Sequence, residues 1–99
     1  SRKVNSYVQP SERAVPFKNM IYLGDGITDI PCMQIIKDNG GYSIGVYLKE
    51  NRRTVDQLLK DKRISFAQQA DYRENSELDR LLQDIIDKIA IEAKLQTYL

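Results

Sequence analysis

The chain has 99 residues, of which 15 are lysine or arginine, 14 are aspartate or glutamate and none is histidine, so its formal net charge is +1. This length allows one domain, or one piece of a larger domain. The balanced charge argues against a dedicated nucleic-acid-binding protein, and no apolar run is long enough to span a membrane. A single cysteine and no histidine exclude zinc-finger ligand sets and histidine-based triads within this sequence. No secretory signal is recognisable, so we expect a cytoplasmic protein.

The first part of the sequence predicts a loop followed by a strand. Residues 1–19 are polar and contain two prolines, so we expect a loop segment with a helical turn near residues 11–13. Met20–Leu23 is a continuous apolar run that ends at Gly24. Such a run is typical of a central parallel strand that is buried on both faces.

A helix and a second strand are predicted next. Apolar side chains recur at helical spacing over residues 28–39, where Pro31 suits the first turn of a helix. Cys32 falls in this apolar helix without a histidine partner, so we expect a buried structural thiol. Residues 42–47 predict the second strand, in which Gly45 would allow the close approach of a neighbour.

The following segment predicts a second helix and a third strand. Asn51 is a suitable cap for a helix that extends to about Lys62. The side chains expected to face inward from this helix are Val55, Leu58 and Leu59. Residues 64–66 are expected to form a short third strand.

The C-terminal part predicts a polar loop and a long helix. Residues 68–75 are expected to form the loop, and Ser76 followed by Asp79 resembles a helix start. The helix carries an apolar stripe made of Leu78, Leu81, Leu82, Ile85, Ile86 and Ile89. Because strands and helices alternate, the sequence predicts an α/β fold with a parallel sheet.

The candidate site lies between the first strand and the first helix. Asp25 would stand at the carboxyl end of the strand, where parallel sheets bind ligands, and Asp29 would follow in the first turn of the helix. Two carboxylates beside the flexible glycines Gly24 and Gly26 suit Mg²⁺, which takes one or two protein carboxylates and keeps several waters. In the alternative interpretation, the glycine segment is an ordinary turn and Asp29 caps the helix.

Residues 19–33, with the sequence NMIYLGDGITDIPCM, closely resemble the fourth motif of haloacid dehalogenase-like hydrolases. In that motif a hydrophobic strand delivers a GDxxxD acid pair. The likeness continues through the strand at residues 42–47 and the helix start at residues 74–79. It implies the Rossmann-like, three-layer core of that superfamily, here only in part, formed by residues 20–99.

The resemblance also implies a chemistry and a set of site residues. The family transfers phosphoryl groups through an aspartyl-phosphate and uses Mg²⁺. Asp25 would bind the metal ion, and Asp29 would bind it or orient its shell. Gly24 and Gly26 would belong to the loop that surrounds the metal and the phosphate. The substrate would be a phosphorylated small molecule, with no role for nucleic acid or membrane.

Other family motifs are missing from this sequence. The nucleophile motif DxDx[TV] does not occur, and the second-motif serine or threonine strand is not identifiable. Lys3 is the local candidate for the third-motif lysine, although Lys3 and Lys18 are more simply interpreted as solvated loop residues. We therefore expect the C-terminal portion of a phosphatase-type hydrolase, inactive alone, that binds the missing N-terminal part of the same protein or self-associates. No catalytic residue is identifiable within the chain.

Other interpretations remain open at this point. The chain could be a non-catalytic α/β interaction module in which the acidic loop is only a turn. A phospho-regulatory domain would need a phosphoacceptor aspartate at a separate strand end, and none is evident. Residues 71–75 follow the third predicted strand and could share a rim with Asp25, or form an ordinary charged loop. Arg52 and Arg53 are interpreted as a solvated first turn of a helix.

Overall fold

A computed structural model describes residues 15–99 of the chain. Of the expected N-terminal loop, the described part contains one 3₁₀ turn, η1 (Phe17–Asn19), and Lys18 is exposed within it. The helical turn expected near residues 11–13 and the candidate Lys3 lie outside the described residues.

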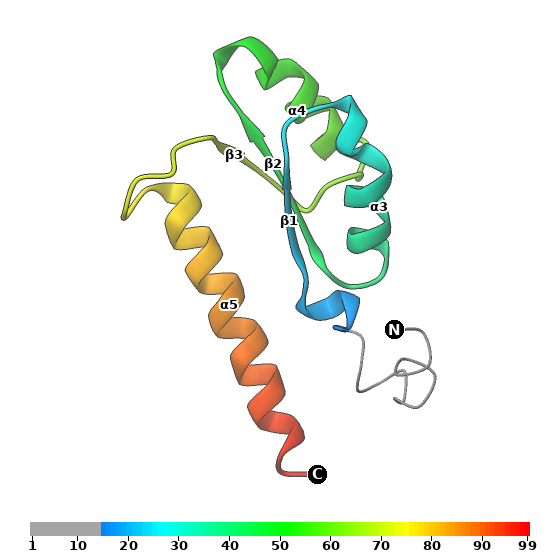
Figure 1. Cartoon of the computed structure of the whole chain (residues 1–99), viewed down its shortest axis with the longest axis vertical. Coiled ribbons are helices and arrows are strands. Elements are labelled where there is room, and N and C mark those ends of the chain that lie inside the picture. Colours follow the sequence, from blue (N-terminus) through cyan, green and yellow to red (C-terminus); the bar gives the residue numbers. More distant parts are fainter. Residues whose placement is uncertain (1–14) are drawn as a thin grey trace, which may run out of the picture.

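Three parallel strands, β1 (Ile21–Gly24), β2 (Tyr42–Tyr47) and β3 (Phe66–Gln69), form a sheet in the order β1-β2-β3 (Figure 1). The register sets Leu23 of β1 beside Ile44 of β2. Each strand therefore ends at the same edge of the sheet, as parallel pairing requires. The predicted α/β fold with a parallel sheet is confirmed.

Three α-helices cover the two faces of this sheet (Figure 1). Helix α3 (Ile30–Asp38) follows the 3₁₀ turn η2 (Ile27–Asp29), and α4 (Arg52–Lys60) follows the 3₁₀ turn η3 (Lys49–Asn51). Both helices pack on one face, whereas α5 (Glu77–Gln96) packs on the other. The result is a layered helix–sheet–helix arrangement.

The core consists of two hydrophobic clusters, one on each face of the sheet. The cluster under α3 and α4 contains Met33, Val55, Leu58 and Ile64. The cluster under α5 contains Ile44, Val46, Leu78 and Ile85. The middle strand β2 contributes to both faces because successive side chains of a strand point in opposite directions.

Gly45 in β2 is required by the packing of α4 on the sheet. A Cβ atom at this position would lie 2.7 Å from both Ile64 Cδ1 and Val55 Cγ1, inside van der Waals contact. The predicted close approach of a neighbour at Gly45 is therefore confirmed.

The start of α5 also follows the prediction. The Ser76 Oγ atom accepts a hydrogen bond from the Asp79 backbone N–H at 3.1 Å, and Asp79 Oδ2 accepts one from the Asn75 N–H at 2.8 Å. The first bond satisfies one of the amides that a helix start leaves without a partner, and the second ties the residue before the cap to the first turn. Within residues 15–99, neither α5 nor a shorter helix combines the length and apolarity of a membrane span.

The third strand lies later in the sequence than predicted. It begins at Phe66 and includes Gln68 and Gln69, which were expected in a loop, while Ile64 is a buried core residue that precedes the strand. Backbone hydrogen bonds to β2 define β3, and it stands at the edge of the described sheet. Polar side chains are tolerated there because an edge strand is not buried on both faces.

Some side chains expected in the core are exposed. Cys32 is exposed, so the expectation of a buried thiol is wrong. Leu59 and Ile86 are 42% and 48% exposed, although both were expected to face inward. Each helix covers the sheet from one side only, so only a narrow stripe of its apolar residues reaches the core. In α3 the buried position is the neighbouring Met33.

Strand β1 was expected to be central, but among residues 15–99 it pairs only with β2. Its side chains are accordingly less buried than those of β2, with Leu23 36% exposed and Ile21 half-buried. One edge of β1 thus presents backbone N–H and C=O groups that no described residue pairs in the sheet.

Candidate functional site

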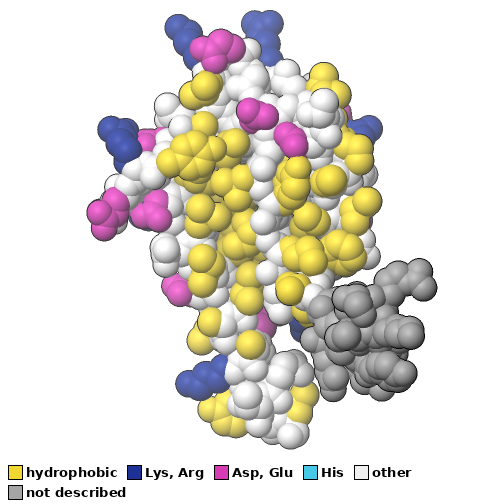
Figure 2. Space-filling view, in the orientation of Figure 1, with side chains coloured by type: hydrophobic (Ala, Val, Ile, Leu, Met, Phe, Trp, Pro, Cys, Tyr) yellow, Lys and Arg dark blue, Asp and Glu magenta, His cyan; other side chains and the backbone are white. Residues whose placement is uncertain are grey.

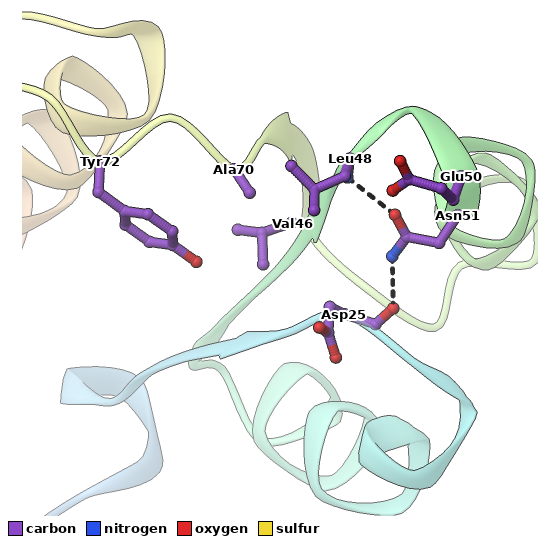
Figure 3. Close-up of a pocket in the computed structure, with 7 residues that line it drawn as sticks. All are labelled: Asp25, Val46, Leu48, Glu50, Asn51, Ala70 and Tyr72. Carbon is purple, nitrogen blue, oxygen red and sulfur yellow. Dashed lines mark hydrogen bonds between the residues drawn. The ribbon is translucent and has the colours of Figure 1, made fainter.

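Asp25 follows β1 directly and stands at the carboxyl end of the sheet (Figure 3). The residue is exposed. Within residues 15–99, no hydrogen bond or ion pair engages its carboxylate, although both its backbone N–H and its C=O are bonded to side chains. The prediction that Asp25 lies at the end of the first strand is confirmed, and its carboxylate is available to a ligand.

Asp29 has a different role in the same loop. Its Oδ1 accepts a hydrogen bond from the Tyr22 hydroxyl at 2.8 Å, and its Oδ2 accepts bonds from the N–H groups of Asp25 at 3.1 Å and Gly26 at 3.3 Å. The hydrogen bond to the Asp29 carboxylate raises the pKa of the Tyr22 phenol. Asp29 therefore folds the loop on itself by capping the 3₁₀ turn η2, whereas its side chain makes no cap hydrogen bond to α3, the helix that it was expected to cap in the alternative interpretation.

The two glycines of the loop are not equivalent. A Cβ atom on Gly24 would lie 2.8 Å from the Asp29 Cβ, so a side chain at position 24 would displace Asp29. A Cβ atom on Gly26 would meet nothing within 4 Å. The N–H of Gly26 is bonded to Asp29 and is thus not directed at a ligand. Gly24 is needed for the loop to close, whereas Gly26 contributes a backbone donor.

Asn51 joins the site to the next strand, a role that the sequence did not reveal. Its Nδ2 donates to the Asp25 carbonyl oxygen at 2.7 Å, and its Oδ1 accepts from the Leu48 N–H at 2.8 Å (Figure 3). The expected side-chain cap on α4 is absent, because the amide is used in these two bonds instead. The Leu48–Asn51 spacing is a local turn signal, but the bond across 26 positions has none.

A pocket of about 540 Å³ opens beside Asp25 at the carboxyl ends of the strands (Figure 3). Figure 3 shows the Tyr72 ring reaching toward the pocket from the segment between β3 and α5, opposite Asp25 and Asn51. The full lining consists of Asp25, Val46, Leu48, Glu50, Asn51, Ala70 and Tyr72. Of the two interpretations left open for residues 71–75, the shared rim with Asp25 applies to Tyr72.

The neighbours of Tyr72 form a charged turn. The Arg73 guanidinium donates from Nε and Nη2 to the Asp71 carboxylate at 2.8 and 2.7 Å, and it lowers the pKa of Asp71 to about 2. Asp71 also lines a second, polar pocket of about 370 Å³. Arg52 lies over the Tyr47 ring, 5.1 Å from its centre. These cations are therefore engaged locally, on the protein surface.

Within the part of the chain that the structure describes, no group of three or more His, Cys, Asp or Glu side chains could hold a metal ion. Asp25 offers one unpaired carboxylate, since that of Asp29 is used by the loop. One protein carboxylate with water and phosphate oxygens is a donor set that Mg²⁺ accepts. Among the described residues, Asp25 could therefore supply one of the ligands of a Mg²⁺ ion.

The chain is similar to a distant relative among known proteins. The chain is 29% identical over 92 residues to an uncharacterized protein of Borreliella burgdorferi. This match covers 90% of the chain but 31% of the relative, so the chain spans about a third of that protein's length. No family model matches the chain, and no solved structure matches it.

Proposed function

We propose that this chain is the C-terminal part of a Mg²⁺-dependent phosphohydrolase of the haloacid dehalogenase-like type. The observation that carries the proposal is the state of Asp25. Two other side chains hold its backbone N–H and C=O, while no side chain or backbone group of residues 15–99 pairs with its carboxylate beside the pocket. The loop thus fixes the backbone at Asp25 and leaves its carboxylate free for a ligand.

In this proposal the two acids of the motif have separate tasks. Asp25 is the metal ligand, and Asp29 keeps the loop closed through Tyr22 and the loop amides. Bound Mg²⁺ would offset the negative charge that develops on a transferring phosphoryl group. Asp25 would also help to hold a phosphorylated small molecule at the strand ends through that ion.

The nucleophile of the proposed hydrolase is an upstream aspartate, carried by a strand that pairs with β1. Two observations support this position. One edge of β1 has no described partner in the sheet. The backbone N–H and C=O groups along this edge could pair with a further parallel strand. Figure 2 also shows hydrophobic side chains gathered on the face that contains β1 and the neighbouring part of α5. The N-terminal part of the same protein would cover this surface.

We place this activity in the cytoplasm. The single cysteine cannot form a disulfide within the chain, which agrees with a reducing compartment. The proposal also requires a longer protein. The requirement for a longer protein is supported by the length of the relative from Borreliella burgdorferi, because the chain spans 31% of that protein.

The test is Asp25→Asn in the intact protein, with hydrolysis of p-nitrophenyl phosphate as the assay. We expect kcat to fall by about 100-fold or more, because a charge-stabilising group of the transition state is weakened. The free energy of unfolding should change by less than about 0.5 kcal/mol, as for an exposed side chain without partners. Asp87→Asn is the matched control, since Asp87 is exposed in α5 and away from the strand ends.

Near-normal activity of Asp25→Asn would contradict the proposal. A loss of activity that matches a loss of folded protein would do so as well, because it would make Asp25 a structural residue. The control Asp87→Asn should retain both activity and stability.

A non-catalytic α/β interaction module is the second candidate, and the open edge of β1 favours it. Such a module would bind its partner through β1, and the acid loop would serve as a turn. The phosphatase assay on the intact wild-type protein separates the two functions. A module would keep its partner binding and would show no phosphatase activity in the intact wild-type protein.

A further inference from the structure

The loop after β1 holds Asp25 from both sides. The peptide before its Cα is held through the Asp25 N–H, which donates to Asp29 Oδ2 at 3.1 Å. The peptide after its Cα is held through the carbonyl oxygen, which accepts from Asn51 Nδ2 at 2.7 Å. Fixing both peptide planes fixes the two backbone dihedrals of Asp25, and hence the direction of its Cα–Cβ bond. The direction of the carboxylate is therefore set by its neighbours, although no group within residues 15–99 bonds to the carboxylate itself.

Asn51 is chemically suited to the second of these contacts. Its Oδ1 accepts from the Leu48 N–H at 2.8 Å, which turns the amide so that the Nδ2 group faces the Asp25 carbonyl (Figure 3). The contact needs one acceptor and one donor on a short side chain, and only asparagine offers both at this length. Aspartate would place an oxygen against the carbonyl oxygen, and leucine would leave both backbone groups unpaired.

The contact also ties two parts of the sheet together. Asn51 belongs to η3, the turn that follows the middle strand β2, whereas Asp25 follows β1. The bond from Asn51 thus fixes the position of Asp25 relative to the buried strand β2, and not only relative to the edge strand β1. This arrangement is valuable for a metal ligand, because small displacements of a ligand weaken binding strongly.

We propose that Asn51 is a positioning residue that holds Asp25 in its metal-binding orientation. It acts through the main chain of Asp25, so it is not a catalytic residue. The inference rests on the proposed function, because it assumes that Asp25 is a metal ligand, and it adds a residue from outside the GDxxxD segment.

The experiment measures the dissociation constant of Mn²⁺ by electron paramagnetic resonance in the intact protein. Asn51→Ala removes both bonds, and we expect it to weaken Mn²⁺ binding by about 10-fold or more. Asn39→Ala is the matched control, since the Asn39 Nδ2 also donates to a backbone carbonyl, that of Ile35 at 2.7 Å, at the far end of α3. Both variants lose one side-chain bond to a carbonyl, but only the first should change Mn²⁺ affinity.

A second variant, Asn51→Asp, guards against a general loss of folding. It keeps an acceptor for the Leu48 N–H and loses the donor to Asp25. Its added negative charge would by itself favour a cation, so weaker Mn²⁺ binding in this variant must come from the lost donor. Mn²⁺ binding as tight as in the wild type in Asn51→Ala, which adds no charge, would overturn the inference, because the donor would then be dispensable.

Asp25→Asn in the same assay separates this inference from the proposed function. If Asp25→Asn leaves Mn²⁺ binding unchanged, the proposed metal site is wrong, and the inference about Asn51 falls with it. If Asp25→Asn weakens binding but the Asn51 variants do not, only the positioning role is wrong. In the Asp25→Asn background, Asn51→Ala should have no further effect on Mn²⁺ affinity, since the ligand that it positions is gone.

Discussion

The different roles of the two loop acids predict unequal effects of their removal on stability. Asp29→Ala removes a carboxylate that accepts three hydrogen bonds, two of them from backbone amides of the loop. Loss of a capping side chain costs about 0.5–2 kcal/mol, and with three bonds we expect the upper half of that range, ~1–2 kcal/mol. Asp25→Ala removes an exposed carboxylate with no described partner, so we expect a change below about 0.5 kcal/mol.

Thermal unfolding followed by circular dichroism measures this difference. In a domain of this size, each kcal/mol lowers the midpoint by ~4–8 °C, so Asp29→Ala should unfold clearly earlier than Asp25→Ala. Equal destabilisation by the two substitutions would refute the division of roles. A neutral Asp29→Ala would refute it too, because the three bonds would then contribute nothing to the fold.

The Tyr22 phenol gives an independent check on the same contact. Its hydrogen bond to Asp29 raises its pKa from the ordinary value of 10.0, since the bond favours the neutral phenol. A raised pKa means that stability from this bond is present below pH 10.0 and is lost as the pH rises toward the folded-state pKa. In a spectrophotometric titration, Asp29→Ala should return the Tyr22 pKa toward its ordinary value. A titration of Tyr22 that is the same in both proteins would contradict the bond.

Three further predictions concern the rest of the domain. Gly45→Ala should destabilise the fold by about 1–3 kcal/mol in urea titrations, because the added methyl group overpacks the contact with Val55 and Ile64. Asp71 should titrate near pH 2 in carboxyl NMR spectra and return toward 3.8 in Arg73→Ala; stability from this pair is present above pH 3.8 and lost as the pH falls toward 2. The 99-residue chain alone should self-associate at micromolar concentration in sedimentation experiments, whereas a monomer with strongly protected β1 amides would show that the open edge needs no partner.

The elements that the sequence predicts well are those with local signals. The run at residues 20–23 and the strand at residues 42–47 are apolar enough to identify, and the Ser76–Asp79 helix start depends on side chains three positions apart. Strand β3 has no such signal. Its glutamines pair with β2 through backbone groups that any residue carries, so its extent is fixed by the neighbouring strand.

The position of the candidate site could be predicted from the sequence, but the different roles of Asp25 and Asp29 could not. A strand, a glycine and two spaced acids indicate where Asp25 and Asp29 lie. Which of them is free depends on Tyr22, whose hydroxyl approaches Asp29 only once the loop has closed. The group that bonds to the Asp25 carbonyl is Asn51, in the turn after β2. From the sequence, an asparagine before a helix is expected to cap that helix, which Asn51 does not do. Long-range hydrogen bonds of this kind leave no periodic trace in a sequence.

The contact between Gly24 and Asp29 has a consequence for how this segment can vary among related sequences. The atoms nearest to an added Cβ at position 24 are the Cβ and Cγ of residue 29, at 2.8 and 2.9 Å, so almost any residue at position 29 demands glycine at position 24. Positions 25 and 26 serve Asp29 through their N–H groups, which every residue except proline provides. Because there is open space around Gly26, we expect other residues to replace it freely in related sequences. Gly24 should be kept even in those related sequences that lack an acid at position 29.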